Sequence, residues 1–233
     1  MGTGVALSGS GRLLSVALIL ALLSACGSEK PQASPLVQAV SVVAKSAVSR
    51  ASAKRAGGGS AAAPAPVTRA DLEKYGTPIM RAVVPARGAD ALLTPGDVKG
   101  SVVTWSTSDG TTFTLRDGIL IQTRGLGPDL MSAQVPSVGQ LLTAGGTHQR
   151  LYYFLGADDQ TTRRSYDCTV AITGKETIVI MERSHSVTHV TETCSRPQGA
   201  ITNEFWIEGS KVRKSHQLLS GGAGFVDFEW IID

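Results

Sequence analysis

The chain has 233 residues, of which 42% are hydrophobic and 18% charged, and its formal net charge is +3. Of this charge, +1 belongs to residues 1–25 and +4 to residues 26–66, which leaves −2 for residues 67–233. Because a nucleic-acid-binding domain needs a basic patch on a folded face, this distribution argues against nucleic acid as a partner. The remaining length suits one domain with a hydrophobic core of its own.

The first 25 residues are typical of an export signal. Arg12 precedes a mostly apolar run over residues 13–23, which is shorter than the roughly 20 residues of a membrane-spanning helix. The following segment, Leu23-Ser24-Ala25-Cys26, resembles the bacterial lipobox, in which the cysteine is acylated and becomes the new N-terminus. The alternative is an ordinary signal peptide with an incidental cysteine.

We therefore predict a signal peptide over residues 1–25 and lipidation of Cys26. Gly27 follows the cysteine in place of the aspartate that retains lipoproteins in the inner membrane, which favours the periplasmic face of the outer membrane. Each buried methylene of an acyl chain contributes about 0.8 kcal/mol, so two or more chains give stable anchoring.

Residues 26–66 have the composition of a tether. Apolar residues recur at helical spacing over 36–55, which predicts one helix there, and residues 56–66 are a Gly-, Ala- and Pro-rich linker. The basic charge of the tether would favour anionic lipid. The alternative is a simple solvated linker.

From residue 67 the pattern predicts an all-β domain, mainly antiparallel and barrel-like or a curved sandwich, with a short N-terminal helix. Thr68 and Asp71 have the spacing of a capping box that would begin this helix. Asp-Gly pairs separate three β-rich runs over 101–106, 111–115 and 119–123, which is a hairpin signal. Further strands are predicted over 149–155, 164–173, 176–183, 186–194, 202–208, 211–218 and 224–232.

Two cysteines, Cys168 and Cys194, remain once Cys26 is lipidated. An even pair in an oxidising compartment predicts a disulfide, which would stabilise the fold by on the order of 3 kcal/mol. A catalytic cysteine would need an activating base, and a zinc knuckle would need a different spacing.

The sequence contains no phosphate-binding glycine loop, nucleophile elbow or metal-ligand motif, so neither a cofactor nor a metal is expected. His185 and His189 lie four apart on a predicted strand, where they would stand about 13 Å from each other, too far to share one ion. His148 and His216 belong to no constellation that points to a reaction.

Asp227 and Glu229 lie two apart on the last predicted strand, so both point to one face about 7 Å apart. Paired carboxylates at such a separation serve glycoside hydrolysis. The alternation of these acids with apolar residues is, however, that of any half-buried strand, and no catalytic residue is assigned.

Three tryptophans, Trp105, Trp206 and Trp230, are candidates for contact with a ligand. Their faces could stack on sugar rings, and burial in the core is the alternative for each.

An ordered series of short motifs runs through residues 67–233. The first half holds Thr104-Trp105, Asp109-Gly110-Thr111, Asp117-Gly118, Thr123-Arg124-Gly125-Leu126 and Asp129-Leu130. The second half holds Glu176-Thr177-Ile178, Glu192-Thr193-Cys194, Glu204-Phe205-Trp206 and Gly224-Phe225-Val226-Asp227-Phe228-Glu229-Trp230. Together they resemble the YjbF/GfcB family of outer-membrane lipoproteins, from which the spacer over 36–66 departs.

The resemblance implies a largely antiparallel β fold and a role in exopolysaccharide or group 4 capsule production and export. It implies an outer-membrane β-barrel and a periplasmic export protein as partners, and it supplies no catalytic residues. We therefore expect a non-enzymatic accessory lipoprotein that contacts the barrel, the polysaccharide or both. The alternatives are a lipid or lipoprotein carrier with an apolar concave face and a glycan-modifying enzyme that uses Asp227 and Glu229.

Overall fold

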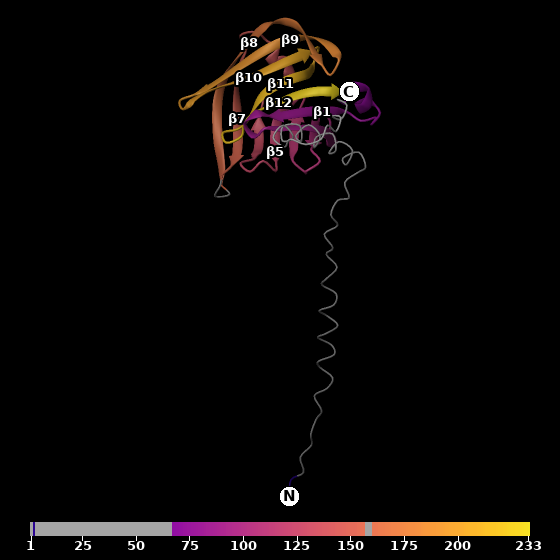
Figure 1. The fold of residues 1–233 in the computed structure, drawn as a ribbon. Helices are drawn as coiled ribbons and strands as arrows, with labels where there is room; N and C mark the ends of the chain where they lie inside the picture. The colour runs from indigo at the N-terminus through magenta and orange to yellow at the C-terminus, as the bar shows by residue number, and fades with distance from the viewer. Residues whose placement is uncertain (1, 3–66, 157–159) are drawn as a thin grey trace, which may run out of the picture. The chain divides into compact units, whose positions relative to one another are not determined.

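The computed structural model describes Gly2 and residues 67–156 and 160–233 (Figure 1). The predicted signal peptide, Cys26, the helix over 36–55 and the linker lie outside the described residues. Within those that the structure describes, no helix has the length and apolar character needed to cross a membrane.

The described domain is built almost entirely of strands. Its short helices are α3 (Arg69–Glu73), the 3-10 turn η1 (Pro85–Arg87) and α4 (Val138–Leu141). Its strands are β1 (Ile79–Val84), β2 (Ala89–Lys99), β3 (Val102–Ser106), β4 (Thr112–Arg116), β5 (Ile119–Arg124), β6 (Leu130–Gln134), β7 (Thr147–Leu155), β8 (Thr161–Ile180), β9 (Arg183–Arg196), β10 (Gly199–Glu208), β11 (Lys211–Ser220) and β12 (Gly224–Ile232).

All the strands join one antiparallel sheet in the order β5-β4-β3-β2-β1-β12-β11-β10-β9-β8-β7-β6. Strands that are consecutive in sequence are neighbours except for β5 and β6, and β12 pairs with β1, beside which it lies in Figure 1. Only the step from β5 to β6 lacks a ladder among the described strands, so the sheet forms a nearly closed barrel. The predicted fold class is confirmed, including the capping box of α3, where Thr68 and Asp71 each accept a backbone N–H from the other.

The sequence predicts separate strands over 164–173 and 176–183, but 164–173 and the first five residues of the second stretch belong to the single strand β8, which ends at Ile180. Gly174 does not turn the chain, because the ladder with β9 absorbs the extra residue as a bulge between Ile172 and Gly174. The turn comes instead at Met181 and Glu182, whose φ angles are 40° and 70°.

The sequence patterns do not predict strands β1, β2 and β6. Strand β2 contains Pro95 and Gly96, which usually interrupt a strand. The β2–β3 ladder shifts register between Pro95 and Asp97, so the proline lies at an irregularity of the ladder, which is one of the places where strands accept proline.

Side chains close the gap between β5 and β6. The Thr123 hydroxyl donates to Asp129 Oδ1 at 2.9 Å and accepts the backbone N–H of Leu130, also at 2.9 Å. The carboxylate of Asp129 accepts the backbone N–H groups of Gly125 and Leu126. The stretch Thr123–Leu130 is therefore a tightly bonded loop that holds the two edge strands together.

The interior of the barrel is filled by side chains. Trp105 packs edge-to-face against Trp230 with ring centroids 5.1 Å apart, and Phe113 packs in the same way against Phe228 at 5.4 Å. Cys168 and Cys194 are opposite each other on β8 and β9, and a disulfide joins them within this core.

A polar cluster lies inside the same barrel. The fully buried Glu192 accepts hydrogen bonds from Arg150 Nε at 2.7 Å and Asn203 Nδ2 at 2.7 Å, and lies 2.5 Å from His148 Nε2. Burial alone would raise the pKa of Glu192, but the Arg150 guanidinium and these hydrogen bonds lower it to about 2. Glu192 is therefore a buried carboxylate held in its ionised form.

Candidate functional site

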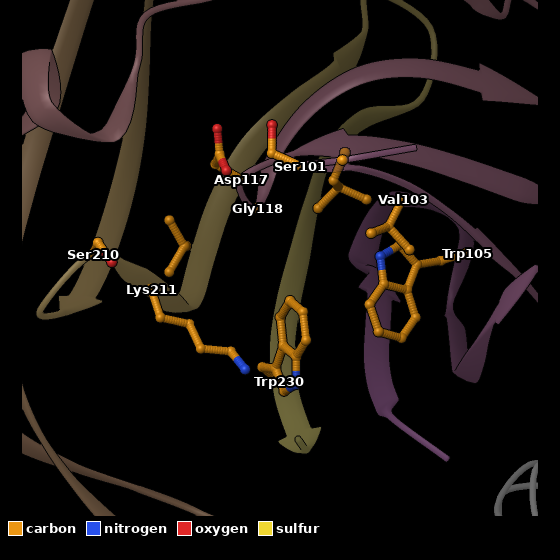
Figure 2. A pocket seen from close by; sticks show the side chains of 11 residues that line it. Ser101, Val103, Trp105, Asp117, Gly118, Ser210, Lys211 and Trp230 are labelled. Atoms are coloured by element: carbon orange, nitrogen blue, oxygen red, sulfur yellow. The ribbon is translucent and has the colours of Figure 1, made fainter. Parts of the chain in front are cut away.

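One candidate site is a cavity of about 260 Å³, here called the tryptophan pocket (Figure 2). It lies among the turns that join β2 to β3, β4 to β5 and β10 to β11, beside the end of β12. Its lining residues are Gly100, Ser101, Val103, Trp105, Leu115, Asp117, Gly118, Ser210, Lys211, Val212 and Trp230.

The Asp117-Gly118 turn forms one wall of the tryptophan pocket. Both residues have positive φ, of 50° and 84°, a conformation that glycine adopts without strain. A Cβ on Gly118 would lie only 2.7 Å from Cβ of Val212 on β11. The absence of a side chain at residue 118 thus lets β5 approach β11 closely.

The base of the pocket combines aromatic and charged groups. Figure 2 shows the Lys211 side chain extending toward Trp230, with Nζ 3.8 Å from the ring centroid. The same ammonium group lies 2.5 Å from Asp233 Oδ1. Burial would raise the pKa of Asp233, but hydrogen bonds from Lys211 and Arg213 lower it to about 2. The Lys211 charge is therefore already compensated, and the pocket offers mainly apolar walls beneath a polar rim.

A second candidate site is an open cavity of about 400 Å³ on the outer face of the barrel, here called the outer-face groove. Its lining residues come from β1, β12, β11 and β10, and ladder registration arranges them as two parallel rows. Taken across the four strands, one row is Arg81, Glu229, Lys214 and Trp206, and the other is Val83, Asp227, His216 and Glu204.

Ion pairs tie the charged members of the groove together. Arg81 donates to both oxygens of Asp90 at 2.8 and 2.7 Å and to Glu229 at 3.3 Å. The hydrogen bonds to Asp90 raise the pKa of Arg81 above its ordinary value. Lys214 Nζ lies 3.6 Å from Glu229 and His216 Nδ1 lies 2.6 Å from Asp227. The charged side chains of the groove are thus paired in two sets, one around Glu229 and one that joins Asp227 to His216.

An aromatic stack forms one end of the groove. His189 on β9 lies parallel to Trp206, with centroids 4.5 Å apart and planes 12° from each other. The indole Nε1 of Trp206 donates to Glu176 at 2.6 Å, and Lys214 Nζ lies 5.2 Å from the indole centroid. These contacts fix the orientation of a partly exposed ring.

The three predicted tryptophans occupy two places. Trp105 is 1% exposed and Trp230 is partly buried against it, and both belong to the tryptophan pocket. Trp206 alone lies on the outer face. The structure thus separates one candidate contact residue from the other two.

Asp227 and Glu229 share the outer face, as their spacing predicts, and both line the groove. His189 lies beside it, whereas His185 is 1% exposed and 3.2 Å from Glu208. His216 is part of the groove and His148 belongs to the interior cluster.

The interior cluster has one arrangement that resembles a metal site. Potential ligand atoms of His148, Cys168 and Glu192 lie within 4.8 Å of one another. The Cys168 sulfur is committed to the disulfide, and Glu192 is neutralised by Arg150. These residues therefore do not fit a metal ion while the disulfide is intact.

Sequence reasoning did not single out Arg81, Lys214 or Glu204. Each lies on a strand with alternating polar residues, but that alternation is common to every half-exposed strand. These three residues lie beside Asp227 and Trp206 because of the register in which β1, β12, β11 and β10 pair. The four strands lie between residues 79 and 232, so no local pattern shows this arrangement.

Comparison with known proteins supports one family. No curated protein matches the chain. Among solved structures, the chain is similar to the hypothetical lipoprotein YmcC from Escherichia coli, with a TM-score of 0.63 and 21% sequence identity over 72% of this chain and 89% of that one. At this identity the likeness concerns the fold. The family model described as "Group 4 capsule polysaccharide lipoprotein gfcB, YjbF" matches residues 39–231. The chain therefore belongs to the YjbF family of group 4 capsule polysaccharide lipoproteins.

Proposed function

We propose that this protein is a non-enzymatic accessory lipoprotein of capsule or exopolysaccharide production, and that it contacts polysaccharide through the outer-face groove. The observation that carries the proposal is the double row of side chains across β1, β12, β11 and β10. Family membership gives the biological setting, and the groove supplies a surface with suitable chemistry.

The groove suits a polymer because it is open and lies on the surface of the sheet. A polysaccharide segment needs an apolar surface for the faces of its rings and hydrogen-bonding groups for its hydroxyls. Trp206 supplies the first, supported by His189. The carboxylates of Glu204, Asp227 and Glu229 supply acceptors beside it.

The contacts that the carboxylates of Asp227 and Glu229 make favour sugar binding over glycoside hydrolysis. A hydrolase of this type needs one carboxyl group that keeps its proton near neutral pH. Asp227 is bonded to His216, and Glu229 lies between Arg81 and Lys214. Both carboxylates are therefore engaged by side chains of the groove itself, and neither is presented alone to a glycosidic oxygen.

The filled interior also bears on the lipid-carrier alternative. A carrier of acyl chains needs an apolar cavity that can hold them. Here the barrel interior holds packed aromatic side chains, the disulfide and the polar cluster around Glu192. This arrangement counts against acyl chains in the centre of the barrel, and the tryptophan pocket at one end has a volume of only about 260 Å³.

The proposal places the domain on the periplasmic face of the outer membrane, tethered through acylated Cys26. An outer-membrane β-barrel protein and a periplasmic export protein are its proposed partners. Substituting Cys26→Ser should abolish labelling by palmitate and leave the protein at the size of its uncut precursor. Unchanged labelling of this variant would contradict the anchor.

The function itself is tested in a strain that lacks the protein, with polymer in the medium and in the cells quantified separately. We expect the secreted fraction to fall, with polymer either retained in the cells or no longer made. Complementation with the wild type should restore secretion, and the Trp206→Ala variant should restore it only in part. The matched control is Phe225→Ala, which should complement fully. The Phe225 ring stacks on His216 beside the groove, but Phe225 is not one of the residues that line the groove. Unchanged polymer in both fractions of the deletion strain would overturn the proposal.

A further inference from the structure

We infer that the outer-face groove selects uncharged or amino-bearing sugar residues and excludes anionic ones such as uronates. This inference rests on the proposed function, because it names the class of sugar that the same groove would accept. It follows from the balance and pairing of charge around the groove.

Carboxylates outnumber cations in the groove. Its lining has three acids, Glu204, Asp227 and Glu229, against Arg81 and Lys214. Asp90 and Glu176 add two more carboxylates at its borders, where they bond to Arg81 and to Trp206. With neutral histidines, these seven groups have a net charge of −3. An anionic sugar would therefore approach a surface of its own sign.

Neither permanent cation is free to receive an anion. Arg81 lies between two carboxylates and makes a bidentate contact with one of them. Lys214 lies 3.6 Å from Glu229 and over the Trp206 ring. To reach Arg81 or Lys214, a sugar carboxylate would have to displace a protein carboxylate, which would then be left unpaired. The free-energy cost of that unpaired group disfavours binding of the anionic sugar.

The groove offers accessible acceptors to hydroxyl and amino groups. The side chains of Glu204, Asp227 and Glu229 are 38%, 32% and 24% exposed, so their oxygens can be reached by a ligand. A sugar hydroxyl can donate to these oxygens, and a sugar ammonium would gain a charge-assisted hydrogen bond. The partly exposed Trp206 ring beside them can contact the C–H groups of a pyranose ring.

The test measures binding of the mature chain, which begins at residue 26 and has Cys26 replaced by serine, to matched oligosaccharides at physiological ionic strength. Oligogalacturonate and its methyl ester have the same sugar and differ in carboxylate charge, and chito-oligosaccharides with free amines supply the cationic case. We expect the methyl ester and the amino sugar to bind at least about tenfold more tightly than oligogalacturonate.

A charge variant then links the selectivity to the groove. The double variant Glu204→Gln, Asp227→Asn should bind oligogalacturonate more nearly as well as the methyl ester. We expect the ratio of the two affinities to fall by about tenfold. The double variant Glu73→Gln, Asp97→Asn removes the same charge from exposed positions outside the groove and should leave the preference unchanged. An equal change in both variants would mean that net charge alone causes the effect, and the inference would be wrong.

The remaining outcomes separate the inference from the proposed function. Equal binding of all three ligands that is lost in Trp206→Ala would overturn the selectivity and leave the groove as a polysaccharide site. Preferential binding of oligogalacturonate would also overturn the selectivity. Binding of none of them, or binding that survives Trp206→Ala, would reject the groove as a sugar site, and the inference would fall with it.

Discussion

The side-chain amide of Gln217 on β11 takes the place of a strand partner for β5 across the barrel interior. Its Oε1 accepts the backbone N–H of Leu120 at 2.9 Å, and its Nε2 donates to the carbonyl of Gly118 at 2.9 Å. An edge strand would otherwise bury unpaired backbone groups at this point. Gln217 is 2% exposed, so no solvent replaces it.

Replacing Gln217→Leu should lower the free energy of unfolding by about 2–4 kcal/mol, because it leaves a buried N–H and a buried carbonyl without partners. Urea denaturation measures the change. Gln149→Leu, at an exposed residue of β7 that bonds to Asp167, is the control and should change stability by less than about 0.5 kcal/mol. Equal effects of the two substitutions would contradict the role of Gln217.

Gly118→Ala should destabilise the protein for two reasons, its positive φ and its contact with Val212. Gly127→Ala is the matched control, since Gly127 has a φ of 86° and no atom within 4 Å of an added Cβ. We expect about 1 kcal/mol for the control from backbone strain alone and about 1–3 kcal/mol more at Gly118 from overpacking. The second substitution Val212→Ala should recover only the part of this extra loss that comes from Cγ2 at 3.2 Å, because alanine keeps the Cβ at 2.7 Å. Identical losses at Gly118 and Gly127 would show that the close approach has no energetic effect.

The free energy of unfolding should fall in acid because Glu192 becomes protonated. Its pKa is lowered from 4.5 to about 2 on folding, so the unfolded chain binds the proton more tightly than the folded one. The stabilisation is complete above pH 4.5 and is lost as the pH falls toward about 2, by on the order of 3 kcal/mol. Denaturation in urea at several pH values measures this slope.

The Glu192→Gln variant should be less stable than the wild type at neutral pH, because Arg150 would be left as a buried charge without its partner. Its stability should also depend less on pH below 4.5. The control is Asp71→Asn, whose carboxyl also has a pKa of about 2 but lies on the exposed helix α3, and it should retain most of the acid sensitivity. Equal slopes in wild type and Glu192→Gln would contradict this assignment.

Removing the disulfide should lower stability by about 3 kcal/mol, through the greater freedom of the unfolded chain. The double variant Cys168→Ala, Cys194→Ala should unfold at a lower urea concentration than the wild type, and a reducing agent should shift the wild type in the same direction but not the variant. If the reducing agent leaves the wild type unchanged while the variant is destabilised, loss of core packing would be the cause instead.

Some features of this protein follow from local sequence. The capping box of α3, the Asp-Gly hairpins of β3, β4 and β5, and the outward alternation of Asp227 and Glu229 depend on neighbours within a few residues. These preferences are encoded by side-chain spacing and backbone conformation, so the all-β class could be predicted. The pairing of Cys168 with Cys194 was predicted by elimination and lies on adjacent strands.

The remaining features depend on contacts between residues that are far apart in the chain. The outer-face groove depends on β1 pairing with β12, which brings Arg81 to Glu229 across 148 positions. No local pattern marks Gln217 as a partner for β5, and none marks Gly174 as a bulge, since glycine favours a turn equally well. Local residue patterns specify which faces of the strands are polar. Strand order determined which polar side chains meet, and hence where a ligand could bind.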